Sequence, residues 1–377
     1  MLDHGGVQMT LMIGPAYPIP VSRSILDALQ SVRITVNARD TSFFELKFTV
    51  SKSSALLTTF MIAGGGAIPL VRVVIVATVN GTPNVLIDGV MTNHQLAPGS
   101  NGEPSTLTIM GEDLSRVLSY IDFSGIPYPA TPVEGRVLLV LAKYAVLGII
   151  PMVIPSILLD VPIPTSRIPR QQGNDLEYIR ALADEVGYVF YIDPGPQPGM
   201  SFAYWGPEIK VGTPQPALNV DMDAHTNVEQ LSFRFDTENR MLPIVVIQNP
   251  ETKVPIPIPI LDITPLIPPL ARIPAPTKGI APIAGVSKYG PIQALLIGLA
   301  KAAKSADALS ASGSLNVVRY GHVLKARQLV GVRGAGSPFN GLYYVQSVTH
   351  NIRRGEYKQD FTLVRNGLVS TLDTVPA

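Results

Sequence analysis

The chain has 377 residues, enough for two to four compact units. Its residues are 46% hydrophobic and only 15% charged, which indicates large buried interfaces with other chains, as in obligate oligomers. The formal net charge of +1 excludes a chain-wide electrostatic attraction to nucleic acid or anionic lipid. The absence of cysteine excludes disulfides, thiolate metal sites and cysteine nucleophiles.

A strand-rich region over 30–110 follows an N-terminal segment, residues 1–29. Apolar residues alternate along two of its stretches, at Val32, Ile34 and Val36 and at Leu46, Phe48 and Val50. Two further apolar runs, 70–78 and 85–91, flank Asn80 and Gly81, a residue pair that favours a hairpin turn. Short strands at this spacing predict a barrel or a sandwich, and we assign the region as a first β-barrel.

The region 111–218 is predicted to be an α+β middle domain, with a helix over 114–120 near its start. It also contains an apolar stretch, 137–159, that Lys143, Pro151 and Pro155 interrupt, so it lacks the roughly 20 consecutive apolar residues of a membrane span. We expect a buried helix over 135–149 followed by an extended apolar loop. A transmembrane helix is the alternative for this stretch.

The clearest local pattern in the middle domain is the stretch 171–193. Asn174 followed by Glu177 predicts a capping box at a helix start, and Gly187 fits a residue of positive φ at the helix end. An aromatic strand is predicted to follow over 188–192. The residues that recur on one helical face, and should enter the core, are Leu176, Ile179, Ala183 and Val186.

A second β-barrel is predicted from 219–249 and 313–367, with an insertion over 250–312 and a C-terminal tail over 368–377. In 250–282 proline alternates with isoleucine, leucine and alanine, which excludes a helix or a central strand because proline lacks the amide donor. We predict an extended arm that packs on a neighbouring subunit or another protein; a long loop folded over its own domain is the alternative. A helix is predicted over 293–309. The prolines named as candidate partner contacts are Pro255, Pro257, Pro259, Pro268 and Pro269.

Little in the sequence indicates catalysis. The best constellation is Asp221, Asp223 and His225, which alternation would place on one side of an extended segment, where they could bind a divalent metal. We prefer to interpret them as a polar lead-in to a strand. The glycine-rich run 331–336 lacks the spacing of a P-loop and indicates a turn. We therefore predict no catalytic residue, no bound metal and no cofactor.

Three stretches, taken in order, resemble the tail-hub family of contractile phages and related injection machines. This family includes hubs of the late control protein D type, the T4 baseplate hub and the N-terminal half of type VI spike proteins. The stretches are VLIDGVMTNHQ with STLTIMGEDLSRVL in 85–118, QQGNDLEYIRALADEVGYVFYID at 171–193, and the hairpin-like run 321–366. The residues that carry the resemblance are Gly89, Gly111, Asp113, Gln172, Asp175, Leu176, Leu182, Gly187, Tyr188, Gly341, Tyr343, Val345, Phe361 and Arg365.

The resemblance implies a mainly β fold with an α+β middle region: two β-barrel domains, a small α/β insertion and a Pro-rich extended arm. It also implies a homotrimer whose six barrels surround a pore and join a six-fold tail tube to a three-fold spike, without enzymatic activity. The implied partners are further copies of the chain, the tail tube protein, a separate spike protein and other baseplate proteins. DNA or an effector would cross the pore without specific binding.

The implied location is the baseplate of a virion tail, assembled in the host cytoplasm, or of an injection machine, and no membrane span is expected. The sequence does not distinguish a phage from a tailocin or an extracellular injection system. Three other functions stay open at this point. They are a different tail component of the tube or distal-tail type, a metal-dependent β-barrel enzyme that uses Asp221, Asp223 and His225, and a membrane-associated protein that uses 137–159.

Overall fold

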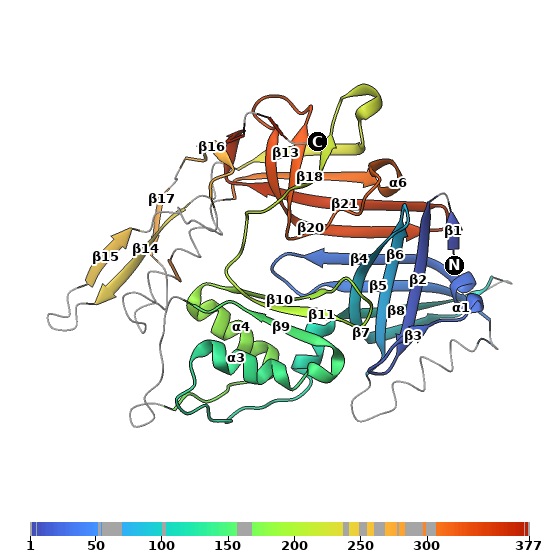
Figure 1. Ribbon diagram of the computed structural model, residues 1–377, viewed down its shortest axis with the longest axis horizontal. Helices are drawn as coiled ribbons and strands as arrows, with labels where there is room; N and C mark the ends of the chain where they lie inside the picture. The colour runs from blue at the N-terminus through green and yellow to red at the C-terminus, as the bar shows by residue number, and fades with distance from the viewer. Residues whose placement is uncertain are drawn as a thin grey trace.

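The computed structural model of the chain has a mainly β fold, as predicted (Figure 1). The two β-rich regions lie against each other, and the middle region with its helices lies below them in this view. The structure describes residues 2–4, 6–51, 54, 70–99, 103–156, 168–236, 241–248, 255–259, 268–276, 279–282, 297–298, 307–372 and 374–375.

The first β-rich region is an antiparallel set of strands with one short helix. Its elements are β1 (Leu2–His4), β2 (Val7–Gly14), β3 (Ile19–Pro20), α1 (Arg23–Ala28), β4 (Leu29–Asn37), β5 (Phe43–Val50), β6 (Arg72–Val79), β7 (Thr82–Ala97) and β8 (Ser105–Asp113). Asn80 and Gly81 join β6 to β7 with φ of 48° and 79°, the left-handed values that a tight two-residue hairpin requires. The predicted hairpin is therefore confirmed.

The second β-rich region continues the same sheet, except for its last strand, which pairs outside that sheet. Its elements are β12 (Gln215–Asn219), η3 (Asp223–His225), β13 (Val228–Phe235), β18 (Leu309–Asn316), α6 (Val317–Tyr320), β19 (Leu329–Arg333), β20 (Gly341–Arg353), β21 (Glu356–Arg365) and β22 (Gly367–Ser370). β4 pairs antiparallel with β20, with Val36 opposite Val348, and this pairing unites both regions in one 14-stranded sheet.

One hydrophobic core also runs through both regions, from Met9 to Leu363. The pairings between the described strands follow an open path from β1 to β13. Closure of each half into a barrel, and the boundaries of the domains, therefore stay predictions.

The middle region is an α/β unit with its own core. Its elements are η1 (Leu114–Ser119), α3 (Val133–Ala142), η2 (Ala145–Leu147), β9 (Ile149–Val153), α4 (Asp175–Val186), β10 (Val189–Pro194) and β11 (Ser201–Gly206). Asn174 and Glu177 form the predicted capping box of α4, and Gly187 ends the helix with φ of 73°. The helices pack on the sheet β10-β11-β9 through residues that include Val137, Ile179 and Trp205.

The predicted helix over 135–149 is wrong in its second half. α3 ends at Ala142, the backbone reverses at Gly148 with φ of 72°, and β9 then pairs parallel with β11. Pairing with β11 stabilises an extended backbone there, which hydrophobicity alone does not reveal. No helix in the described part of the chain is long and apolar enough to cross a membrane.

The Pro-rich insertion contributes a small separate sheet with the strand order β15-β14-β17. Its strands are β14 (Met241–Gln248), β15 (Pro255–Pro259) and β17 (Gly279–Pro282). The prolines at 255, 257 and 259 occupy an edge strand, where a missing amide donor is tolerated. A fourth strand, β16 (Ala271–Pro274), pairs with β22 of the main body. The predicted helix over 293–309 lies almost entirely outside the described residues.

Candidate functional site: a polar junction between the three regions

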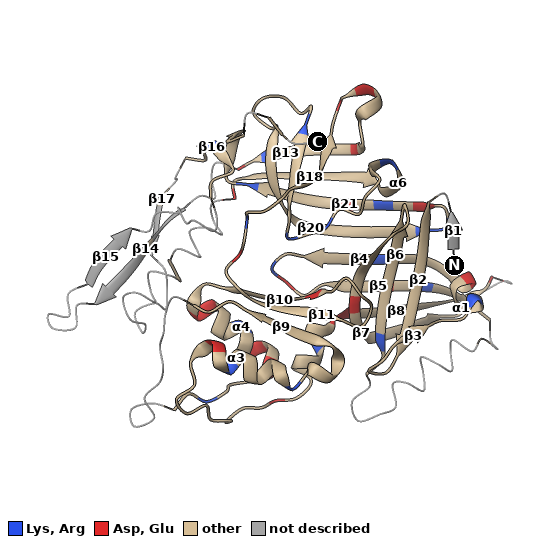
Figure 2. Cartoon of the chain, in the orientation of Figure 1, with Lys and Arg blue, Asp and Glu red and all other residues tan. Residues whose placement is uncertain are grey.

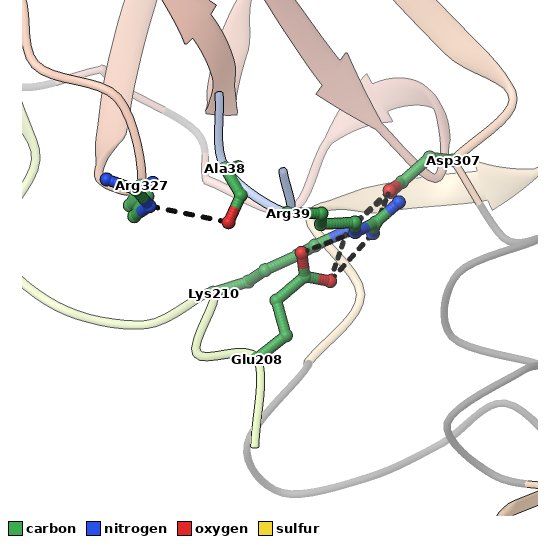
Figure 3. A network of polar contacts seen from close by, with 6 residues as sticks. All are labelled: Ala38, Arg39, Glu208, Lys210, Asp307 and Arg327. Atoms are coloured by element: carbon green, nitrogen blue, oxygen red, sulfur yellow. Dashed lines mark hydrogen bonds and ion pairs between the residues drawn. The ribbon is translucent and has the colours of Figure 1, made fainter. Parts of the chain in front are cut away.

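Four charged side chains from distant segments meet where the three regions join (Figure 3). Arg39, in the turn between β4 and β5, donates from Nε and Nη2 to the two carboxylate oxygens of Glu208, at 2.8 and 2.7 Å. Lys210 donates from Nζ to Asp307 at 2.7 and 2.6 Å. A longer contact of 3.4 Å joins Arg39 to Asp307 and closes the group, which we call the polar junction.

The polar junction is electrically balanced and largely withdrawn from solvent. The Lys210, Glu208 and Asp307 side chains are 4%, 7% and 10% exposed. Burial opposes the charged form of Arg39, but hydrogen bonding and attraction to Glu208 and Asp307 outweigh it and raise the pKa of the guanidinium. These ion pairs join the turn after β4, the segment after β11 and Asp307 of the second β-rich region.

Arg327 adds a second contact between the same regions. Its guanidinium donates to the carbonyl oxygens of Asn37 and Ala38, the latter at 3.3 Å, and pairs with the Asp193 carboxylate of β10. Its centre also lies 4.1 Å from the ring centroid of Tyr191. The loop after β4, the middle region and the second β-rich region are therefore joined at two adjacent points.

A buried ion pair fixes the middle region to the first β-rich region. Arg72 of β6 donates to both carboxylate oxygens of Asp88 in β7, each at 2.7 Å, and both side chains are at most 1% exposed. Arg72 also donates to the carbonyls of Ala16 and Gly199, at 2.9 and 3.1 Å. Sequence reasoning missed this pair, although a charge inside each of two apolar runs was a usable signal.

Within the middle region, Asp175 lies at the centre of a hydrogen-bond network. Its carboxylate accepts from Lys143 Nζ at 2.6 Å, from Tyr144 Oη at 2.7 Å and from Gln171 Nε2 at 2.7 Å. Gln171 in turn accepts from Tyr128 at 2.8 Å. Gln172, the glutamine that the resemblance singled out, is exposed, and its buried neighbour Gln171 makes these contacts. Leu182 and Leu176 enter the core, and Tyr188 donates to the carbonyl of Pro155.

Gly89 and Gly111 stand where strands approach closely. A Cβ on Gly89 would lie 2.2 Å from the carbonyl oxygen of Glu112, and one on Gly111 would lie 2.3 Å from both Phe44 Cζ and the carbonyl oxygen of Val90. Asp113 follows in β8 and accepts from the backbone N–H groups of Ser42 and Ser115, at 2.5 and 2.9 Å. Burial raises the pKa of the Asp113 carboxyl, against the opposite effect of these hydrogen bonds.

The resemblance residues of the second β-rich region form another buried cluster. Arg365 donates to the carbonyls of Pro338, Asn340 and Gly367 at 2.8 to 2.9 Å. Its guanidinium lies over the Tyr343 ring, and Gly341 leaves space for it, because a Cβ there would lie 2.5 Å from Arg365 Nη1. Val345 and Phe361 are buried in the adjoining core. All of these contacts support the fold.

The three candidate metal ligands do not lie on one side of an extended segment. Asp221 and Asp223 both have φ of 49°, and η3 covers Asp223 to His225, so the expected alternation is wrong. All three residues are exposed. Among the described residues, no group of three or more acidic or histidine side chains is arranged to hold a metal ion.

The structure resembles solved tail proteins over its whole length. A tail protein from Neisseria meningitidis MC58 has 13% sequence identity and a TM-score of 0.62, with 97% of this chain and 98% of that chain covered. The 43 kDa tail protein of prophage MuSo2 from Shewanella oneidensis has 14% identity and a TM-score of 0.59, with 95% and 98% covered.

A component of the E. coli type VI secretion system, described as structurally similar to the T4 tail proteins gp27 and gp5, has 10% identity and a TM-score of 0.51, with 93% and 78% covered. No protein-family model and no curated protein sequence matches the chain. At these identities the likeness establishes the fold. The chain has the fold of phage tail proteins, and the resemblance predicted from the sequence is confirmed at that level.

Proposed function

We propose that the chain is a structural hub protein in the baseplate of a contractile phage tail or a related injection machine, and that it has no enzymatic activity. The observation that carries this proposal is a similarity that covers 97% of this chain and 98% of a tail protein. A shared fold of that extent involves the complete arrangement of regions rather than one common module. The buried charges described above contact one another, which also favours a scaffold over a catalyst.

In the proposed hub, three copies of the chain form a ring around a pore. Each chain supplies two β-rich halves joined through β4 and β20, so three copies would present six halves to a six-fold tail tube. The other face of the ring would meet a three-fold spike. A three-fold ring requires heterologous interfaces that close on themselves. The high apolar content of the chain favours such extensive contacts.

The proposed partners are the tail tube protein, a separate spike protein and other baseplate proteins. One similar structure is a chain of a Francisella PdpA–VgrG complex, with a TM-score of 0.59 and 60% of that chain covered. DNA or an effector would pass through the pore without specific binding.

The proposed location can be tested on assembled particles. A short epitope tag at the end of the chain, labelled with gold-conjugated antibody, should mark the junction between tube and spike in electron micrographs. Label along the tube, or at the opposite end of the tail, would contradict a hub. Label along the tube would instead favour a tube component, the second tail function that the sequence left open.

A further inference from the structure

Lys210 and Asp307 of the polar junction are placed as the two reactants of an amide bond (Figure 3). Lys210 Nζ lies 2.7 Å from one carboxylate oxygen of Asp307 and 2.6 Å from the other. Because Nζ contacts both oxygens, the carbon between them lies about 3 Å away, given C–O bonds of about 1.2 Å. Reacting atoms about 3–3.5 Å apart are within near-attack range. The carboxylate need only turn about its Cβ–Cγ bond, a soft torsion, to present its face to the nitrogen.

The surroundings of this pair favour a neutral amide over two ions. The Lys210 and Asp307 side chains are 4% and 10% exposed, and Nζ lies 5.4 Å from the ring centroid of the buried Tyr344. In water, the hydration of an ammonium and a carboxylate opposes their condensation, whereas burial withdraws that hydration from both. Formation of the bond removes two charges from the interior and releases one water molecule, so the buried site favours the amide.

Two further side chains of the polar junction lie beside the reacting atoms. Arg39 Nη2 lies 3.4 Å from Oδ2 of Asp307, an oxygen on which negative charge develops when an amine attacks the carboxyl carbon. Glu208 Oε2 lies 3.9 Å from Lys210 Nζ, and a small side-chain movement brings it within reach of a proton on that nitrogen. Glu208 meets Arg39 through both of its oxygens, as a carboxylate does, and a carboxylate can act as a base. Figure 2 shows how few other charged residues lie in the strands around this point.

We propose that Lys210 and Asp307 condense after folding into an intramolecular isopeptide bond that joins Nζ to Cγ. The ion pair described above is the reactant state. The ammonium passes one proton to the Asp307 carboxylate, and the neutral amine attacks Cγ while Arg39 holds the developing oxyanion. Glu208 takes a second proton from the nitrogen and passes it to the departing hydroxyl group, which leaves as water. Atoms and charges balance without a further reactant, and Glu208 returns to a carboxylate.

A second pair of the same residue types lacks these features and provides an internal comparison. Lys143 Nζ contacts both carboxylate oxygens of Asp175, at 2.9 and 2.6 Å, but the Lys143 side chain is 35% exposed. Asp175 also accepts from Tyr144 and Gln171, and these hydrogen bonds stabilise its ionised form. In the described part of the chain, no second carboxylate pairs with Lys143 and could serve as a base. This pair should therefore stay ionic.

The bond closes a loop over residues 210–307, which contains β12, β13 and the Pro-rich insertion. The chain has no cysteine, so no disulfide restrains this long segment. A covalent link between its two ends restricts the unfolded chain as a disulfide would. The reaction occurs once in each chain and without turnover. It goes beyond the proposed hub function and does not depend on it.

The first test is the intact mass of the denatured full chain, measured by mass spectrometry after the folded protein has been incubated near neutral pH. We expect a mass that is lower by one water molecule than the mass of the sequence. Lys210→Arg keeps the cation but replaces the nucleophilic amine by a guanidinium, so this variant should have the full mass. Lys143→Arg is the matched control and should show the same loss as the wild type. A folded wild-type chain that keeps its full mass throughout overturns the inference.

The second test locates the bond by digestion with trypsin, which does not cleave after a lysine that carries an amide. We expect residues 181–234 joined to residues 305–319 in one branched peptide. A loss of water that maps to any other peptide, or that persists in Lys210→Arg, also overturns the inference.

The variant Glu208→Gln tests the proton transfer, because the amide has a similar shape but cannot accept the proton. The fraction of crosslinked chain, followed against time after synthesis, should rise at least about 10²-fold more slowly than in the wild type. An unchanged rate would overturn the role of Glu208 as the base.

Discussion

One buried histidine should make the stability of the core fall in acid. His350 of β20 is buried, and its Nδ1 lies 2.8 Å from Tyr357 Oη and 3.3 Å from Gln359 Nε2. Both neighbours can donate a hydrogen bond to this nitrogen, so the neutral imidazole fits the site as an acceptor. Burial lowers the pKa of His350 from 6.5 to about 3.

The sign of the resulting pH dependence follows from proton binding. Between about pH 6.5 and pH 3 the unfolded chain binds a proton at His350 and the folded chain does not. The contribution of His350 to the free energy of unfolding is therefore complete above this window and is lost as the pH falls through it. With these two pKa values, the loss is about 2 kcal/mol at pH 5 and approaches about 5 kcal/mol below pH 3.

The substitution His350→Gln retains an acceptor for Tyr357 and removes the titration. We expect the free energy of unfolding, measured by urea denaturation, to change by about 2 kcal/mol less between pH 8 and pH 5 in this variant than in the wild type. His225→Gln, at an exposed histidine, is the matched control for replacing a histidine by glutamine. An equal pH dependence in His350→Gln and the wild type would refute the assignment of a buried neutral imidazole.

Three further perturbations test the account of the fold by urea denaturation. Lys210→Met should lower the free energy of unfolding by about 3–5 kcal/mol because it leaves buried carboxylates without their cation. The double variant Lys210→Met/Asp307→Leu should recover part of that loss. Strictly additive effects of the two substitutions would show that the two residues do not interact. Gly111→Ala should lower the free energy of unfolding by about 1–3 kcal/mol because the added Cβ meets Phe44 and the Val90 carbonyl. The control is Gly135→Ala in α3, where the added Cβ first meets the Thr131 methyl at 3.0 Å, and it should be neutral or stabilising. Equal losses of stability in the two variants would contradict the close approach of strands at Gly111. Asp113→Ala should cost about 1–3 kcal/mol because two buried N–H groups lose their acceptor, and an unchanged unfolding midpoint would contradict that role.

Local sequence patterns predicted the elements that local interactions determine. Asn174, Glu177 and Gly187 define both ends of α4, and Asn80 with Gly81 defines the hairpin between β6 and β7, because the required backbone angles belong to these residue types. The same reasoning failed at β9. Its residues are as apolar as a buried helix, and only the pairing with β11, some 50 residues away along the chain, makes them a strand.

The polar junction was beyond sequence reasoning for a related reason. Arg39 and Asp307 are separated by 268 residues, and each looks like an ordinary surface charge in its own segment. The pairing of β4 with β20 likewise joins distant segments that carry no mutual signal in a single sequence.

The mass and symmetry of the purified chain test the hub proposal most directly. Three chains of 40.4 kDa amount to about 121 kDa (3 × 40.4), and light scattering should return that mass. Negative-stain class averages of the same sample should contain rings with a central hole and pseudo-six-fold outline. A hexamer would instead favour a tube or distal-tail component, and a compact monomer at all concentrations would contradict the hub.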